Sequence, residues 1–85
     1  MLKITHKIKD LNGIHARPAG LLATECKKFK SQITVEKDGK KANAVKIFEL
    51  MSLCVKGGEE IVITIDGDDE TQAFDALAVF LEKYL

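Results

Sequence analysis

QITVEKDGKKAN, residues 32–43, is the stretch that most constrains how this chain can fold. Apolar Ile33 and Val35 alternate with polar residues, as they do along a strand that buries one face. An Asp-Gly pair follows at positions 38 and 39, and such a pair between two extended segments is typical of a tight hairpin turn. We therefore expect antiparallel strands over residues 32–37 and 40–43, with Ile33 and Val35 facing the core.

Alternation of apolar and polar residues recurs on both sides of this hairpin. Near the N-terminus, one face of a half-buried strand is formed by Leu2, Ile4, His6 and Ile8. Asn12-Gly13 interrupts that strand, because Gly13 can adopt backbone angles that other residues resist. Towards the C-terminus, one face of a fourth strand is formed by Ile61, Ile63 and Ile65.

Three further segments carry apolar residues at helical spacing. A first helix begins near Ala16, with Pro18 in its first turn and an apolar face of Ala19, Leu22, Ala23, Cys26 and Phe29. A short second helix covers residues 45–53 and ends at Lys56-Gly57-Gly58. A third is capped by Gly67-Asp68-Asp69, and its apolar stripe is Ala73, Leu77, Phe80, Leu81 and Tyr84. The order β-α-β-β-α-β-α predicts an α+β open-faced two-layer sandwich, with a four-stranded antiparallel sheet covered on one face by three helices.

The bulk composition restricts the class of function. A chain of 85 residues suits a single domain over residues 1–85, and its 13 basic residues balance its 13 acidic ones. That balance argues against nucleic-acid partners. No apolar run approaches the roughly 20 residues of a membrane span, and the alternating N-terminus does not resemble a signal peptide. We expect a cytoplasmic protein without membrane insertion, and a monomer.

The sequence offers no pattern typical of a cofactor or metal site. Cys26 and Cys54 are both expected on buried sides of helices, as small apolar groups. The two histidines and two cysteines lie on separate elements without ligand spacing, and no glycine-rich phosphate loop is present. His6 points inward from the first strand and is interpreted as structural.

GIHARPA, residues 13–19, is the segment that can carry chemistry. Its glycine turn places His15 at the start of a helix, where unpaired N–H groups and the positive end of the helix dipole favour an anion. Pro18 has no N–H, so Ala16 and Arg17 supply the backbone donors. The same potential disfavours the charged imidazolium of His15, and the Arg17 guanidinium suits phosphate oxygens.

These residues resemble the active-site motif of the HPr family, the histidine phosphocarriers of the bacterial sugar phosphotransferase system. Residues 39–43 and 51–53, the chain length and the element order resemble the family too. The resemblance implies that Enzyme I phosphorylates Nδ1 of His15, that Arg17 steadies the phosphoryl group, and that IIA domains of sugar permeases receive it. It further implies a carrier rather than an enzyme. Positions around the family's docking surface correspond in this sequence to Leu21, Lys27, Ile47, Phe48 and Met51.

Three positions depart from the family pattern. Lys46 replaces the regulatory serine of Gram-positive members, so no serine is expected to be phosphorylated there. Gly20 weakens the first helix by up to about 1 kcal/mol, and Glu49 places an acid where many members have glycine or lysine. These departures leave partner choice and regulation open.

Other interpretations remain open at this stage. A regulatory paralogue, in a nitrogen-related or signalling phosphorelay, shares the same motif. A histidine enzyme would need a second acid or base and a cleft, with Asp10 the nearest carboxylate. A nucleic-acid-binding α+β module would need aromatic residues on its sheet. The inward helical faces instead carry Phe29, Phe74, Phe80 and Tyr84. Arg17 could be an ordinary solvated charge, and Ile47 with Phe48 could be core residues.

Overall fold

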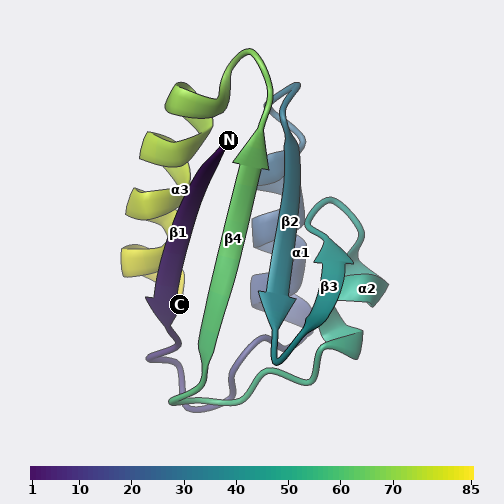
Figure 1. The fold of residues 1–85 in the computed structure, drawn as a ribbon. Coiled ribbons are helices and arrows are strands. Elements are labelled where there is room, and N and C mark those ends of the chain that lie inside the picture. Colours follow the sequence, from purple (N-terminus) through teal and green to yellow (C-terminus); the bar gives the residue numbers. More distant parts are fainter.

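Seven elements follow one another along the chain in the computed structural model, which describes residues 1–85 (Figure 1). They are β1 (Leu2–Lys7), α1 (Ala16–Cys26), β2 (Gln32–Lys37), β3 (Lys40–Asn43), α2 (Ile47–Ser52), β4 (Glu60–Asp66) and α3 (Glu70–Tyr84). The four strands form one antiparallel sheet, and the three helices lie on one side of it. This arrangement confirms the predicted open-faced sandwich.

The strand order in the sheet is β1-β4-β2-β3, so the last strand in sequence lies between the first and the second. Its pairing with β1 joins Leu2 to Ile65 and His6 to Ile61, and its pairing with β2 joins Val35 to Ile63. The inner position of β4 explains its composition. The isoleucines of one face are fully covered, while the residues between them on the other face remain half-exposed.

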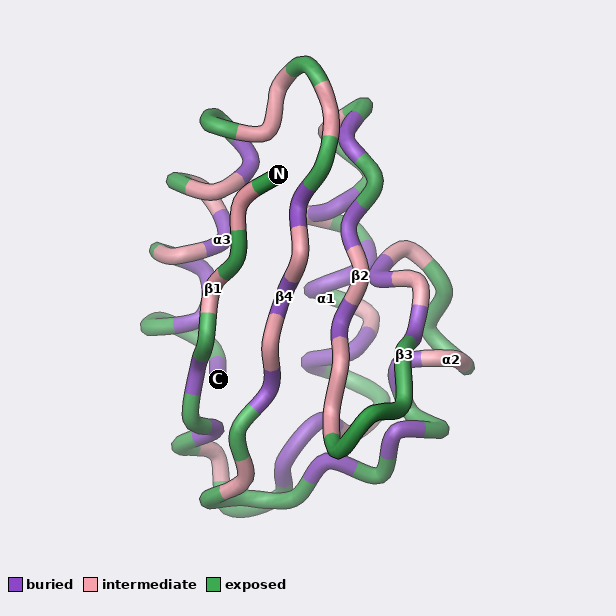
Figure 2. The backbone as a smooth tube through the Cα atoms, in the orientation of Figure 1, coloured by how far each residue is buried: buried purple, intermediate pink, exposed green.

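The core fills the space between the sheet and the helices, as the alternating colours along β4 in Figure 2 illustrate. Ile33 and Val35 of β2 are buried there, as the hairpin pattern predicts. Full burial of an isoleucine side chain contributes about 1.5–3 kcal/mol. The sheet is therefore held by its helix-covered face.

Helix boundaries and helix-end packing differ from the prediction in three places. Helix α1 ends at Cys26, so Phe29 packs against the core from the following turn. Helix α2 is shorter than predicted at both ends. At its start, Asn43 forms a turn in which its side-chain oxygen accepts the Val45 N–H, and at its end Leu53 is the C-cap. At the end of α3, Tyr84 is 43% exposed and Leu85 takes the core position.

The two cysteines have different environments. Cys26 is buried as predicted, and burial raises the pKa of its thiol to about 12, so the thiol is protonated at neutral pH. The prediction for Cys54 is wrong. It is exposed and lies beyond the end of α2, with a φ of 53°, because the chain reverses there to leave the helix.

Asp69 precedes α3 as predicted but does not cap it with its side chain. Its carboxylate accepts hydrogen bonds from the Lys30 N–H and from the N–H and hydroxyl of Ser31. The side chain therefore joins the start of α3 to the turn before β2. None of the helices is long and apolar enough to cross a membrane.

Candidate functional site

His15 lies at the end of a tight loop that leaves β1. The Asp10 carbonyl accepts the Gly13 N–H at 2.9 Å, and Asp10 Oδ1 accepts the Asn12 N–H at 2.9 Å. Gly13 has a φ of +67°, which confirms the turn expected at Asn12-Gly13. Both the backbone and the side chain of Asp10 therefore accept hydrogen bonds that stabilise this turn.

A second loop, residues 54–59, supports the first from behind. The Ile14 N–H donates to the Val55 carbonyl at 3.0 Å. A Cβ on Gly13 would lie 2.0 Å from the Val55 oxygen, and a Cβ on Gly57 would lie 2.7 Å from the Asp10 oxygen. Glycine is required on both sides because the two backbones approach so closely. This contact sets the position at which α1 begins.

His15 occupies the N-cap position of α1, with extended backbone angles of φ −104° and ψ −173°. Its carbonyl accepts the Ala19 N–H at 2.9 Å, while its side chain makes no capping hydrogen bond and is 43% exposed. The N–H groups of Ala16 and Arg17 belong to the first turn, where the helix provides no acceptor. The imidazole therefore lies beside the positive end of the helix.

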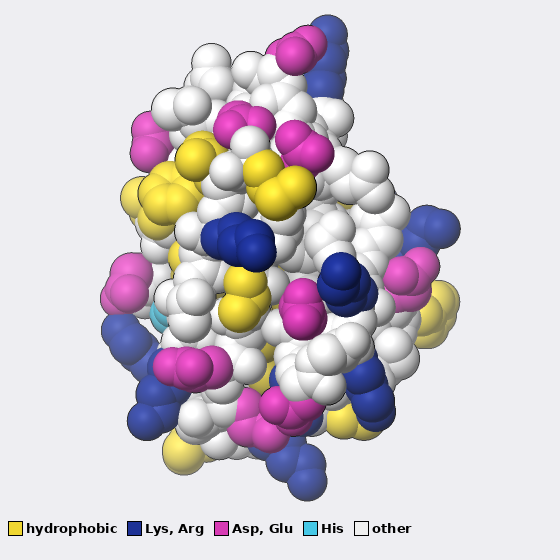
Figure 3. All heavy atoms as spheres, in the orientation of Figure 1, with side chains coloured by type: hydrophobic (Ala, Val, Ile, Leu, Met, Phe, Trp, Pro, Cys, Tyr) yellow, Lys and Arg dark blue, Asp and Glu magenta, His cyan; other side chains and the backbone are white.

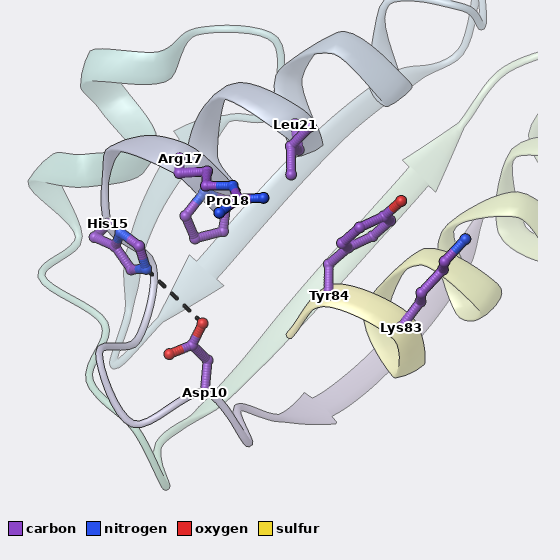
Figure 4. A pocket seen from close by; sticks show the side chains of 7 residues that line it. All are labelled: Asp10, His15, Arg17, Pro18, Leu21, Lys83 and Tyr84. Atoms are coloured by element: carbon purple, nitrogen blue, oxygen red, sulfur yellow. Dashed lines mark ion pairs between the residues drawn. The ribbon is translucent and has the colours of Figure 1, made fainter.

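The His15 side chain lines a pocket of about 300 Å³, and residues near the C-terminus also line it (Figure 4). The lining residues are Asp10, His15, Arg17, Pro18, Leu21, Lys83 and Tyr84. Arg17 is exposed and makes no hydrogen bond or ion pair within the chain, so its guanidinium is available to an incoming group. Arg17 and Lys83 give the pocket two cationic side chains, which favour an anion there.

Asp10, Lys83 and Tyr84 were not predicted as site residues. The position of Asp10, two residues before Asn12, is a sequence signal for a side chain that closes a turn. Lys83 and Tyr84 have no such signal, because only the packing of α3 against β1 and α1 brings them to the pocket. No group of three His, Cys, Asp or Glu side chains lies close enough together to hold a metal ion.

Four of the expected docking residues are exposed and apolar, and they lie on α1 and α2, which pack against each other. Phe48 is 87% exposed, and Leu21, Ile47 and Met51 are each 38% exposed. Phe48 is therefore not a core residue, whereas Leu50 of the same helix is fully buried. We call these four exposed residues the apolar patch. A surface that includes so exposed an aromatic ring is typical of a protein-binding site.

Lys27 and Lys46 flank different helices of the site. Lys27 follows the last residue of α1, so it is about 18 Å along the helix from His15. Lys46 precedes Ile47 at the start of α2, and its Nζ lies 3.7 Å from Glu49 Oε2. Lys46 thus adjoins the apolar patch, while Lys27 lies at the opposite end of α1 from the pocket.

The open face of the sheet carries acidic and basic side chains interspersed, as Figure 3 shows. His6 is buried on the other face, as predicted, and its Nε2 has no hydrogen-bond partner. His15 is thus the half-exposed histidine of the chain, and His6 the buried one. The chemistry of the site centres on His15 and the pocket.

A protein-family model described as the phosphorylation site of the HPr component of the phosphotransferase system matches residues 2–83. This chain belongs to the HPr family. Members of the family are phosphocarriers, non-enzymatic components of the phosphotransferase system. Helix α1 and the His15 loop lie within the matched residues.

Relatives within the HPr family cover nearly the whole chain. The HPr-like protein Crh of Halalkalibacterium halodurans is 46% identical over 77 residues, 91% of this chain and 92% of its own length. The phosphocarrier protein HPr of Mycoplasma pneumoniae is 44% identical over 85 residues, 99% of this chain and 97% of its own.

Solved structures of the family share the fold. A histidine-containing phosphocarrier protein from Mycoplasma superposes with a TM-score of 0.93 at 39% identity, covering 96% of this chain and 93% of that one. A dimer of HPr from Thermoanaerobacter tengcongensis gives a TM-score of 0.77 at 46% identity, covering 98% and 95%. Dimers therefore occur among the relatives.

Proposed function

We propose that residues 1–85 act as one phosphocarrier domain that accepts a phosphoryl group on Nδ1 of His15 from phosphorylated Enzyme I. IIA domains of sugar permeases then receive it. The observation that carries this proposal is the half-exposed His15 imidazole at the N-terminus of α1, with the unpaired Arg17 lining the same pocket. Helix N-termini bind phosphate through their free N–H groups.

Each group of the site has a distinct task in this transfer. The lone pair of His15 attacks phosphorus, and the N–H groups of Ala16 and Arg17 donate to the phosphoryl oxygens. The Arg17 guanidinium adds charge-assisted donors from the exposed side. Because the phosphoryl group remains partly exposed, a partner can reach it for the next transfer.

The apolar patch provides the docking surface in this proposal. Leu21 lines the pocket and also belongs to the patch, so a partner that covers Ile47, Phe48 and Met51 would also approach His15. Lys46 adds positive charge at the edge of the patch and favours an acidic partner. Lys27 would extend the contact along α1.

The test is phosphorylation by Enzyme I and phosphoenolpyruvate, followed by transfer to a panel of IIA domains. The wild type and His6→Ala should each gain one phosphate that survives base and is lost in acid, and His15→Ala should gain none. Arg17→Ala should transfer about 10²-fold more slowly, which is typical for the loss of one preorganised donor. Normal acceptance by His15→Ala, or its loss in His6→Ala, would refute the assignment.

A second candidate is a regulatory member of the family, which the similarity to Crh, described in Bacillus subtilis as a catabolite repression HPr, supports. In that role the chain would take part in a nitrogen-related or signalling phosphorelay rather than in sugar uptake. The IIA panel separates the two roles, because a regulatory carrier would accept phosphate without passing it to any sugar IIA domain at a useful rate.

Lys46 bears on regulation in either role. Lysine has no hydroxyl to phosphorylate and its charge is opposite to that of phosphoserine. We propose that an HPr kinase with ATP does not modify this protein. Intact mass should therefore remain unchanged for the wild type and rise by one phosphate for Lys46→Ser. An acid-stable phosphate on the wild type would contradict this.

We further propose that the carrier works in the cytoplasm as a monomer. Light scattering at micromolar concentration tests the oligomeric state. A mass of twice 9.4 kDa would instead agree with the dimers known among the relatives.

A further inference from the structure

The Asp10 carboxylate faces one edge of the His15 ring (Figure 4). Its Oδ2 lies 3.8 Å from His15 Nε2, while its Oδ1 accepts the Asn12 N–H at 2.9 Å. The hydrogen bond to Asn12 holds the carboxylate in place. The oxygen that faces His15 is therefore positioned by the turn.

This arrangement distinguishes the two ring nitrogens. A neutral imidazole has one N–H and one lone pair, and a carboxylate can only accept a proton donor. The N–H is therefore favoured on Nε2, towards Asp10, which leaves the lone pair on Nδ1. At 3.8 Å the contact is coulombic rather than a hydrogen bond, and such contacts in unliganded sites commonly tighten when the reacting group binds.

No other charged side chain of the pocket favours this tautomer. The remaining charged side chains that line it, Arg17 and Lys83, are cations that cannot accept a proton donor. Tyr84 also lines the pocket, and its ring lies under Lys83 Nζ, 5.4 Å from the ring centre. Asp10 is the one carboxylate there.

We propose that Asp10 is a positioning residue for phosphoryl transfer, which selects the His15 tautomer whose Nδ1 lone pair attacks phosphorus. This inference rests on the proposed function of His15. In the step, the Nδ1 lone pair forms the new P–N bond, and the electron pair of the breaking bond returns to the donor. The Nε2 proton stays in place, and Asp10 faces the positive charge that the ring acquires.

The variant Asp10→Asn separates this role from the structural one. The asparagine side-chain oxygen can still accept the Asn12 N–H, so the turn is retained. Its amide group then faces Nε2 as a donor and favours the lone pair on that nitrogen. Asp68→Asn is the matched control, since it removes the same charge from an exposed position before α3, at the opposite end of that helix from the pocket.

The first measurement is the tautomer ratio of neutral His15, from the nitrogen-15 chemical shifts of its ring in the unphosphorylated protein. We expect the Nε2–H form to dominate in the wild type and in Asp68→Asn. In Asp10→Asn the ratio should fall by about five-fold, a modest change because both side chains are partly exposed. If Asp10→Asn fails to fold, Asp10→Ser keeps a turn acceptor too short to reach His15. An unchanged ratio in the variant that folds would overturn the proposal.

The second measurement is the rate of phosphorylation by Enzyme I. Asp10→Asn should be about three- to five-fold slower than the wild type, and Asp68→Asn should equal the wild type. If Asp10→Asn changes the tautomer ratio but is phosphorylated as fast as the wild type, Asp10 does not contribute to the transfer step. If no protein accepts phosphate, the proposed function fails, and the tautomer measurement still decides whether Asp10 orients His15.

Discussion

Replacing Gly13 by alanine tests the close approach of the two loops that position His15. An alanine at a φ of +67° costs about 1–2 kcal/mol in backbone conformation. Its Cβ would lie 2.0 Å from the Val55 oxygen, so the loops must separate, which costs a further 1–3 kcal/mol or so as in other overpacked sites. Separation also weakens the hydrogen bond from Ile14 to Val55, worth about 1 kcal/mol. We expect Gly13→Ala to lose about 3–6 kcal/mol, a large share of the stability of a small domain.

Gly39→Ala provides the matched control for this prediction. Gly39 also has a positive φ, +82°, but a Cβ there would meet nothing within 4 Å. Only the backbone cost of about 1–2 kcal/mol applies. Urea unfolding gives both free energies, and the rate of phosphorylation by Enzyme I should fall in Gly13→Ala alone. If the two variants lose equal stability, the two loops do not approach each other closely at Gly13.

Three further variants test other features of the structure. Gly20→Ala should raise the free energy of unfolding by about 0.5–1 kcal/mol, because a Cβ there meets nothing within 4 Å; a loss in urea unfolding would contradict it. Phe48→Ala should lose less than about 1 kcal/mol and weaken binding to Enzyme I, whereas Leu50→Ala should lose about 2–5 kcal/mol. A loss of 3 kcal/mol or so for Phe48→Ala would mark its ring as part of the core. Asp69→Asn tests how stability depends on pH. The hydrogen bond from the Ser31 hydroxyl, and next that from the Lys30 N–H, lower the pKa of the Asp69 carboxyl. The carboxylate stabilises the fold above its ordinary pKa of 3.8, and this contribution is lost as the pH falls from there through the lowered value. The wild type should therefore exceed Asp69→Asn in stability at neutral pH and equal it in strong acid, and a constant difference in unfolding midpoint across that range would refute the link.

The strands, and which of their residues face the core, were predictable because alternation of apolar and polar residues is a local signal. Ile33 and Val35 alternate with polar neighbours, the isoleucines of β4 recur at every second position, and the Asp-Gly turn joins two of the strands. Helix ends were less predictable. Tyr84 and Leu85 are both compatible with an apolar stripe, and only the position of β1 determines which of them is buried.

The site was predictable in part for the same reason. The placement of His15 at the start of α1 depends on neighbouring residues, and the structure has it there. The contribution of Lys83 depends on tertiary packing, which no local pattern reports. Cys54 was misplaced because an apolar residue at helical spacing does not reveal that the helix has already ended.

The backbone contacts behind the His15 loop also have a consequence for how the protein acquires its activity during folding. Ile8 exchanges hydrogen bonds with Gly58 and Glu59, and Ile14 bonds to Val55, so the loop is shaped by a segment far away in sequence. Such nonlocal contacts form only when the intervening chain has closed, which is the slow part of folding a sheet of this topology. A nascent chain that has not yet reached β4 would have the histidine and the arginine but not their arrangement. Acceptance of phosphate should therefore mark completion of the whole fold, and not merely synthesis of the motif.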